Sequence, residues 1–358
     1  MAFPQKPCVS LEAPDIRAYA HADPRGFIAQ HRDGAILDEV QRAPELASYL
    51  QGEVDARPEP GRFILTGSAN LSLLQSVSQS LAGRTALLTL LPLSHAEVLR
   101  FPQPPADLFE TLWRGGYPAI FDRALPPHEW LAAYVGTYVD RDVRQLLNVT
   151  DLLAFQTFLR LAAGRASQLL NLSALGADAG VTHNTAKAWV SVLEATYVAV
   201  RVPPLHVNIR KRLTRTPKVL FCDPGLLCYL LGISSPEQLR HHPSRGAIFE
   251  TWALSEILKV RVHRGLAPAL SFYRDRQGHG GEIDAIVDRG DAIVALEAKS
   301  AQTVADDFFS GFARGGPALT SAASGRPIEK RLVYGGDRRE RRHDVEVLPW
   351  REMSAAAW

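Results

Sequence analysis

Short, continuously apolar runs alternate with helical patterns over the first 100 residues, and this alternation is the strongest constraint on the fold. Four such runs lie at residues 7–12, 34–40, 61–68 and 85–94. Strands that are apolar along their whole length are typical of a parallel sheet covered on both faces. Residues 43–56 show helical spacing, and Asp23 and Pro24 form a helix-entry pair. We therefore expect a four-stranded α/β layer in this part of the chain.

Two adjacent carboxylates, Asp38 and Glu39, follow the second apolar run. An acid at a strand end can hold Mg²⁺, usually through water, and the next acid can polarise a water that attacks phosphate. Thr66 and Ser68 end the next strand, where a polar side chain can sense a γ-phosphate. Arg84 could supply positive charge near a transferring phosphate. These residues predict a nucleotide site; the alternative is that the two acids cap the following helix.

The sequence does not supply the phosphate-binding half of such a site. Nucleotide hydrolases bind phosphate through a glycine-rich loop, whose backbone N–H groups and lysine contact the phosphate oxygens. None of the seven lysines follows a glycine, so the sequence contains no Gly-Lys-Ser/Thr motif. We therefore expect ATP binding and hydrolysis to be lost in this chain.

The middle of the chain has a helical pattern that ends in a helix-turn-helix. One helix is expected from Ser173, a turn at Gly180, a second helix from about Thr182, and then a strand-like run at 197–203. Such a unit with a wing suits a DNA major groove, but winged helices also serve as spacers.

A basic island follows at residues 210–218, and another lies at 338–342. Arg210, Lys211 and Arg212 in the first island are candidates for contacts with nucleic-acid phosphates. The alternative for both islands is a solvated surface. DNA is therefore one expected partner, and a protein is the other.

From about residue 216 the pattern becomes α+β and carries a second set of chemical side chains. Asp284 lies on one expected strand, and Glu297 and Lys299 lie on the next, where strand alternation points both to one face. Two carboxylates that converge with a lysine suit metal-dependent phosphodiester cleavage. The acids, completed by Glu250, would hold Mg²⁺, and the lysine would orient water or stabilise charge. Two alternatives are ordinary salt-bridging charges on a surface hairpin and a fold relic without catalysis.

Length, cysteine content and hydropathy narrow the class of protein. A chain of 358 residues is expected to form two or three domains. Its three cysteines form neither a metal-ligand cluster nor a disulfide framework, which favours a reducing cytoplasm. No apolar run reaches the roughly 18 residues of a membrane span, so no membrane partner is expected.

A series of motifs, in a fixed order along the chain, carries a resemblance to a known family. They are GAILDEVQRAPEL, GRFILTGSANL, SLAGRTALLTLLPLS, WRGGYP, YVDRDVRQLLNV, TPKVLFCDPGLLCYLLGI, GAIFETWALSEIL and GEIDAIVD with VALEAKS. From about Cys8 to about Tyr334 the chain resembles the prokaryotic AAA-type ATPases that carry a C-terminal domain of unknown function 4143. The resemblance implies an N-terminal P-loop ATPase domain, a helical and winged-helix middle, and a C-terminal domain with a restriction-endonuclease-like fold.

The resemblance also implies roles for the candidate residues. Asp38 and Glu39 match the Walker-B acids, Thr66 and Ser68 match a polar strand end resembling sensor 1, and Arg84 falls in the family's LAGR segment. The nuclease-like set is matched by Glu250, Asp284, Glu297 and Lys299. ATP and Mg²⁺ are the implied cofactors.

The chain departs from the family pattern at its amino end. Members carry a β-strand and P-loop a few tens of residues before the segment matched by residues 7–15, which here stands almost first. That strand is central in the family's sheet, between the strands matched by 85–91 and 61–68, so its loss would leave two buried edges without partners. We expect an N-terminally truncated member, through a misassigned start codon or a degraded gene. An in-frame GKT or GKS upstream of Met1 would indicate a misassigned start, and stop codons would argue against it.

The expected organisation has three parts: an incomplete AAA-type parallel sheet with helices at 1–104, a helical and winged-helix region at 105–215, and a nuclease-like α+β domain at 216–358. Three functions compete for the chain. It is an ATPase homologue that acts on DNA or a protein partner, a magnesium-dependent nuclease, or a non-catalytic DNA-binding or assembly module.

Overall fold

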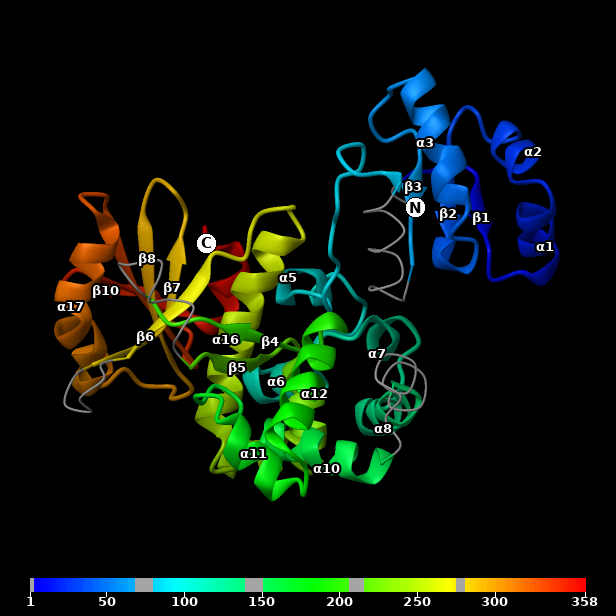
Figure 1. The fold of residues 1–358 in the computed structure, drawn as a ribbon. Coiled ribbons are helices and arrows are strands. Elements are labelled where there is room, and N and C mark those ends of the chain that lie inside the picture. Colours follow the sequence, from blue (N-terminus) through cyan, green and yellow to red (C-terminus); the bar gives the residue numbers. More distant parts are fainter. Residues whose placement is uncertain (1–2, 68–79, 139–150, 206–215, 275–280) are drawn as a thin grey trace. The chain divides into compact units, whose positions relative to one another are not determined.

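The computed structural model describes residues 3–67, 80–138, 151–205, 216–274 and 281–358 (Figure 1). The chain divides into two compact units, residues 1–87 and residues 88–358. Each unit is described by itself.

The first unit is built on a parallel sheet of three short strands in the order β1-β2-β3. The strands are β1 (Cys8–Ser10), β2 (Ile36–Asp38) and β3 (Ile64–Leu65). The helices are α1 (Pro14–Ala22), α2 (Pro24–Ala29), the 3-10 helix η1 (Val40–Arg42) and α3 (Leu46–Ala56). Asp23 caps α2 by accepting a hydrogen bond from the backbone N–H of Gly26, as the helix-entry pair predicts. Leu37 and Leu50 are buried in the core between sheet and helices.

The predicted fourth strand is wrong, because residues 85–91 are neither strand nor helix. Leu87, Leu88 and Leu90 in this run are 58, 71 and 81% exposed. A strand is stable only when its backbone N–H and C=O groups find partners in a neighbouring strand. Within the described residues β3 is the edge of the sheet, and no strand flanks its outer side.

The second unit begins with a helical region. Its helices are α5 (His95–Val98), α6 (Leu108–Arg114), α7 (Pro118–Asp122), α8 (Pro127–Tyr138), α10 (Leu152–Ala163), α11 (Leu172–Asp178), α12 (His183–Ala195), α14 (Pro224–Leu230) and α15 (Pro236–His241). In the described part of the chain, no helix is both long and apolar enough to cross a membrane.

The predicted helix-turn-helix corresponds to α11 and α12. Gly180 makes the turn with φ +72°, and Thr182 caps α12 by accepting from the backbone N–H of Thr185. An antiparallel pair follows, β4 (Ala199–Val202) with β5 (Lys218–Phe221), which matches the predicted strand-like run.

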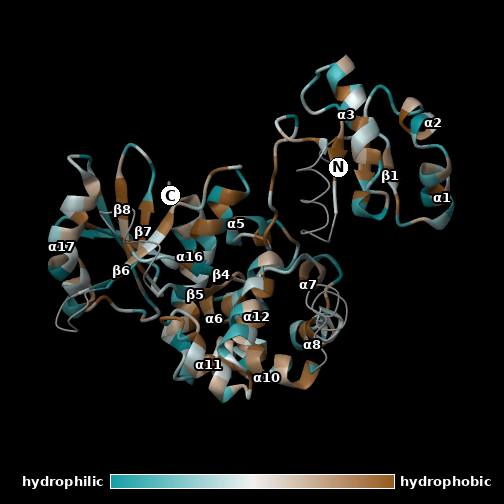
Figure 2. Cartoon of the chain, viewed as in Figure 1, coloured by the Kyte–Doolittle hydropathy of each residue, from teal (hydrophilic) through white to brown (hydrophobic). Residues whose placement is uncertain are grey.

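A mixed six-stranded sheet completes the second unit, in the order β10-β11-β9-β8-β7-β6. Its strands are β6 (Leu270–Arg274), β7 (Glu282–Asp288), β8 (Ile293–Lys299), β9 (Ile328–Tyr334), β10 (Glu340–Arg342) and β11 (Val345–Pro349). The other elements are the helices α16 (Arg245–Val262) and α17 (Ser310–Ala323) and the 3-10 helices η3 (Asp306–Phe309) and η4 (Trp350–Ala355). The sheet lies between α16 and α17, and β7 and β8 are among its most apolar strands (Figures 1 and 2).

The helical region and the sheet share one hydrophobic core. This core runs from Phe155 on α10 and Trp189 on α12, through Trp252 on α16, to Leu296 on β8. The boundary expected near residue 215 falls inside the second unit, where β4 and β5 pair across it. The helical region therefore supports the sheet directly.

Candidate functional site

The carboxyl ends of the three parallel strands bring polar side chains together in the first unit. Asp38, at the end of β2, accepts a hydrogen bond from Thr66 Oγ1 at 2.6 Å and another from Ser10 Oγ at 3.0 Å. Ser10 is the last residue of β1, and Thr66 directly follows β3. Ligands of open α/β sheets bind outside the carboxyl ends of the strands, so this strand-end cluster (Ser10, Asp38 and Thr66) lies where a nucleotide site is expected. Sequence reasoning named two of its members and missed Ser10, although Ser10 ends the first apolar run in the same way.

Glu39 adopts an unusual backbone conformation beside this cluster. Its φ of 56° and ψ of 40° lie in the left-handed region, which few residues other than glycine occupy. Its carboxylate accepts from Gln41 Nε2 at 2.6 Å and lies 4.0 Å from Arg42 Nε. It stands at the N-cap position of η1 without making a side-chain capping bond, so helix capping does not explain it. Backbone strain of this kind clusters at functional sites.

The described contacts of Arg84 lie with Asp55 rather than with the strand-end cluster. Arg84 Nε lies 2.5 Å from Asp55 Oδ1, and the pKa of Asp55 is lowered chiefly by its hydrogen bond with Arg84. Asp55 stands in the last turn of α3, roughly 14 Å along the helix axis from its first residue at 1.5 Å per residue. Ser68 lies outside the described residues.

The C-terminal candidates converge between β7 and β8. Lys299 Nζ lies 2.7 Å from Glu297 Oε2 and 3.5 Å from Asp284 Oδ2. Asp284 also accepts from the backbone N–H of Ala298 at 2.9 Å. A β-bulge in β7 places Asp284 and Ala285 opposite the single residue Phe272 of β6. Bulges are frequent beside functional sites, where they redirect a side chain.

Glu250 joins this group through a lysine that sequence reasoning did not select. Lys218 Nζ, on β5, lies 2.9 Å from Glu250 Oε1 and 2.7 Å from Glu282 Oε1. The four acids Glu250, Glu282, Asp284 and Glu297 are hereafter called the acid cluster. Lys218 is the last residue of the basic island at 210–218, and the composition of that island indicated solvated or phosphate-facing residues. The side chain of Lys218 is nevertheless only 2% exposed.

Burial and mutual repulsion perturb the acid cluster. Burial, followed by the charge of Asp284, raises the pKa of Glu250 to about 7 and the pKa of Glu297 to about 8. Burial alone would lower the pKa of Lys218 and of Lys299, but the surrounding carboxylates raise both above the ordinary lysine value. Both lysines therefore stay charged at neutral pH, while the two glutamates take up protons far more readily than exposed glutamates do.

The arrangement does not fit the predicted divalent metal. Across the described ranges, no three His, Cys, Asp or Glu side chains are grouped so as to hold a metal ion. Glu297 Oε1 is buried without a hydrogen-bond partner there, but it faces α17, where a Cβ on Gly311 would lie 2.1 Å from it. The other carboxylates meet the ammonium groups of Lys218 and Lys299 instead.

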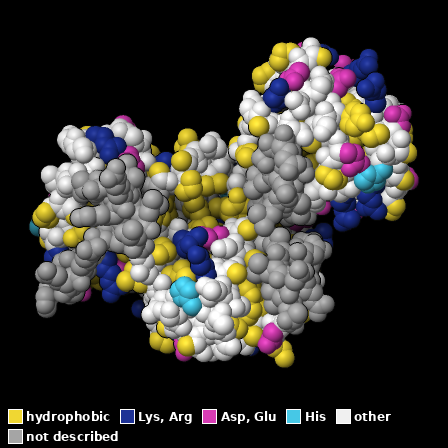
Figure 3. Space-filling view, in the orientation of Figure 1, with side chains coloured by type: hydrophobic (Ala, Val, Ile, Leu, Met, Phe, Trp, Pro, Cys, Tyr) yellow, Lys and Arg dark blue, Asp and Glu magenta, His cyan; other side chains and the backbone are white. Residues whose placement is uncertain are grey.

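The candidate nucleic-acid interface is described only in part. Arg210, Lys211 and Arg212 lie outside the described residues. On α12, His183, Asn184, Lys187 and Ser191 are exposed and recur along one face of the helix. Lysine and arginine side chains of the described residues lie in separate groups on the face shown in Figure 3.

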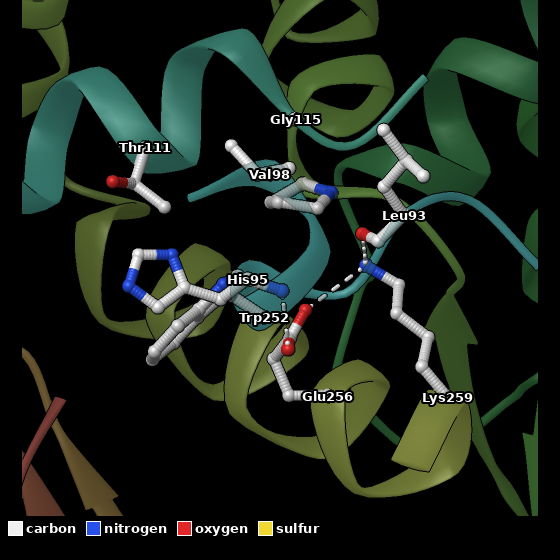
Figure 4. A pocket seen from close by; sticks show the side chains of 9 residues that line it. Leu93, His95, Val98, Thr111, Gly115, Trp252, Glu256 and Lys259 are labelled. Atoms are coloured by element: carbon white, nitrogen blue, oxygen red, sulfur yellow. Dashed lines mark hydrogen bonds and ion pairs between the residues drawn. The ribbon is translucent and has the colours of Figure 1, made fainter. Parts of the chain in front are cut away.

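A small pocket lies between α5, α6 and α16 (Figure 4). Its cavity of about 10 Å³ has room for roughly one water molecule. Glu256 Oε2 accepts from the backbone N–H of His95 at 2.8 Å, and Lys259 donates to the carbonyl of Leu93 at 3.1 Å. The His95 ring packs beside Trp252, and burial lowers its pKa. The pocket therefore fastens α5 to α16 and is too small for a substrate.

Models of three known families match three consecutive parts of the chain. Residues 3–99 match the model of an AAA domain. Residues 105–237 match the domain of unknown function 8612, and residues 245–353 match the domain of unknown function 4143. The α/β unit with its parallel sheet and the β-rich sheet at the C-terminus agree with this division.

Two mycobacterial relatives extend the comparison. They are uncharacterized proteins of Mycobacterium tuberculosis and Mycobacterium bovis, each 31% identical to this chain over 271 residues. The match covers 75% of this chain and 58% of each relative. The chain therefore spans less than two thirds of the length of these relatives.

Proposed function

We propose that the chain is an AAA-family, ATPase-like protein with a C-terminal domain of unknown function 4143, and that its first unit retains the magnesium and water side of a nucleotide site. The observation that carries this proposal is the strand-end cluster, in which Thr66 and Ser10 hold the Asp38 carboxylate at the edge where three parallel strands end. Asp38 would hold Mg²⁺ through water, and Glu39, one residue later, would polarise the attacking water.

The sequence does not supply the loop that binds phosphate in such a nucleotide site. Because no lysine follows a glycine, the 358-residue chain offers no Gly-Lys-Ser/Thr loop to the β- and γ-phosphates. We propose that ATP binding and hydrolysis are consequently lost in this chain.

Phosphate release from ATP tests this proposal. The 358-residue chain and its Asp38→Asn variant should release inorganic phosphate at the same background rate in 5 mM MgCl₂. Magnesium-dependent release by the chain that Asp38→Asn abolishes would overturn the claim that hydrolysis is lost. A rate above background that is equal in both proteins would instead indicate a contaminating ATPase, and the assay would be repeated on re-purified protein.

The partner on which such a protein acts is proposed to be DNA, with a protein partner as the alternative. Support comes from α11 and α12 with the β4–β5 hairpin behind them, and from the exposed polar face of α12. The second helix of a helix-turn-helix reads the major groove with residues near its N-terminus, where His183, Asn184 and Lys187 lie. The three cysteines are free, which supports a reducing, cytoplasmic location.

Salt dependence of duplex binding distinguishes these partners. If α12 contacts DNA, affinity for a 20-base-pair duplex should fall steeply between 50 and 200 mM NaCl, and Lys187→Glu should weaken binding and lower the salt slope by about 1 or more. A matched control is Lys330→Glu, because Lys330 lies on β9 and pairs with Asp344 at 2.6 Å. Equal affinity of all three proteins would favour the protein partner.

The magnesium-dependent nuclease is the weaker alternative for the C-terminal unit. The convergence of Asp284, Glu297 and Lys299 supports it. Among the described residues, however, the carboxylates are not grouped so as to hold a metal ion. That disagreement leads to a separate inference about the acid cluster.

A further inference from the structure

We infer that the ammonium group of Lys218 takes the place of a divalent metal ion in the acid cluster. Its ion pairs hold the β4–β5 hairpin against α16 and the six-stranded sheet. This inference is independent of the proposed nucleotide site. It concerns only the second unit.

The position of Lys218 is the first argument. Its ammonium group stands between Glu250 of α16 and Glu282 of β7, at 2.9 and 2.7 Å. The ring of Phe272 on β6 lies beneath it, with the ring centroid 5.2 Å from Nζ. A cation placed between two carboxylates from different elements, over an aromatic face, has the contacts that a bound cation would require.

The local charge is the second argument. The acid cluster has four carboxylates and meets two ammonium groups, one between Glu250 and Glu282 and the other, from Lys299, between Asp284 and Glu297. The guanidinium of Arg274 adds a third positive charge, 3.8 Å from Glu282 Oε2. Each pair of carboxylates thus already has a cation from the chain itself. Mg²⁺ requires about six oxygen ligands in octahedral geometry, whereas one oxygen of each of these carboxylates already contacts an ammonium group.

The backbone around Lys218 shows how the β4–β5 hairpin is attached to the six-stranded sheet. Lys218 is the first residue of β5 and pairs with Val202 at the end of β4. Pro203, which follows β4, accepts a hydrogen bond from the backbone N–H of Phe272 at 3.1 Å. The hairpin is therefore joined to the sheet by backbone bonds at one point and by the Lys218 ion pairs beside it. A lysine buried to this degree is strongly destabilising when its partners are removed, so these contacts act as a latch.

Manganese binding by the full 358-residue chain is the direct test, because Mn²⁺ substitutes for Mg²⁺ at oxygen-rich sites. After removal of metals with EDTA, calorimetric titration with MnCl₂ alone should give no saturable heat that Glu250→Gln removes, whereas binding at Asp38 of the first unit is untouched by that substitution. The Tm of the second unit should be the same in 1 mM EDTA and in 5 mM MnCl₂. Saturable binding near one Mn²⁺ per chain that Glu250→Gln abolishes would overturn the inference.

Substitution of Lys218 provides the second arm. Lys218→Gln should lower the Tm of the second unit by roughly 10 °C, because it leaves buried carboxylates without their cation. MnCl₂ should restore several degrees of this loss by taking the vacated position. Lys218→Gln combined with Glu250→Gln, which removes the charges together, should be more stable than Lys218→Gln alone. The control is Lys330→Gln, whose partner Asp344 is largely exposed, and its Tm should change by no more than about 2 °C.

The outcomes distinguish a divalent-metal site from a cluster whose cation is Lys218. A Lys218→Gln chain no less stable than Lys330→Gln would contradict the latch. If Lys218→Gln does not fold, the manganese titration of the unaltered chain and the stability of the double variant still decide between a metal site and a built-in cation.

Discussion

At the scale of single residues, the strand-end cluster depends on hydroxyl groups. Asp38 accepts from Thr66 and from Ser10, and both donors belong to neighbouring strands. A carboxylate held by hydroxyl donors keeps its charge for a cation, whereas a buried lysine or arginine partner would neutralise it. The contacts of Asp38 therefore fit metal chemistry better than those of the acid cluster, where lysines are the partners.

Replacement of Thr66 tests this arrangement. Thr66→Val removes the donor at 2.6 Å and should lower the free energy of unfolding of the first unit by about 1–2 kcal/mol. Thr66→Ser keeps the hydroxyl group and should cost less than half as much. Urea unfolding followed by circular dichroism measures both. A loss in Thr66→Ser as large as that in Thr66→Val would contradict a dominant role of the hydrogen bond, because serine keeps the hydroxyl group and lacks only the methyl group.

Two glycines of α17 provide a matched pair for the acid cluster. A Cβ on Gly311 would lie 2.1 Å from Glu297 Oε1 and 2.3 Å from the carbonyl oxygen of Glu282, whereas a Cβ on Gly316 would meet nothing within 4 Å. Gly311→Ala should therefore destabilise the second unit by about 1–3 kcal/mol. Gly316→Ala should be neutral or stabilise it by up to about 1 kcal/mol. Thermal unfolding distinguishes them, and equal effects would contradict the close approach of α17 to Glu297.

At the scale of elements, the attachment of α5 to α16 should make the second unit sensitive to acid. Burial is the main cause that lowers the pKa of His95, and the nearby Arg351 and Lys259 lower it further against an opposing effect of Glu256. The folded state therefore resists protonation, while the unfolded state binds a proton as pH falls below about 6.5. The stability contributed by neutral His95 is present above that pH and is lost as pH falls below it.

Unfolding at different pH values tests this linkage. Between pH 7 and pH 5.5 the free energy of unfolding should fall by at most about 1.4 kcal/mol per pH unit from this group. His95→Phe keeps an aromatic ring between Trp252 and Trp350 and should show a smaller slope over the same range. An unchanged slope would assign the acid sensitivity to other groups.

Periodicity predicted many of the elements because their burial follows a simple pattern. The helix at 43–56, the helix-turn-helix and the strands that became β7 and β8 were all predicted. The strand at 85–91 failed because an apolar run becomes a strand only when a neighbour is present to pair with it. No strand or helix was predicted beyond the basic island at 338–342, yet β11 and the buried Trp350 and Trp358 lie there.

The candidate sites were predictable only within short stretches of sequence. Glu297 and Lys299 share a strand face by alternation, and the next strand brings Asp284 to them. Lys218 could not be identified in this way, because it lies 32 residues from Glu250 in sequence and at the end of a basic island. Only the packing of β5 against α16 and β7 reveals that it is buried.

At the scale of the whole molecule, the two units have separate hydrophobic cores. The first core includes Leu37 and Leu50, and the large second core extends from α6 to the C-terminal Trp358. Residues 85–91 join the units in sequence and expose three leucines. Exposed segments without regular structure are the preferred sites of proteolysis.

Limited digestion with thermolysin should therefore cut between residues 85 and 91 and release a stable fragment that ends at Trp358. Mass spectrometry identifies the new N-terminus, and the Tm of the fragment should match that of the second unit in the whole chain. A fragment that unfolds or is degraded at once would show that the second unit depends on the first.

Calorimetric titration of Mg-ATP into the 358-residue chain is the most direct test of the central claim, that the first unit has the magnesium and water side of a nucleotide site without the phosphate-binding side. The account predicts no saturable heat at ATP concentrations up to 1 mM, for both the unaltered chain and Asp38→Asn. Saturable binding near one ATP per chain that Asp38→Asn weakens would contradict it, because phosphate binding would then come from groups other than a Gly-Lys-Ser/Thr loop.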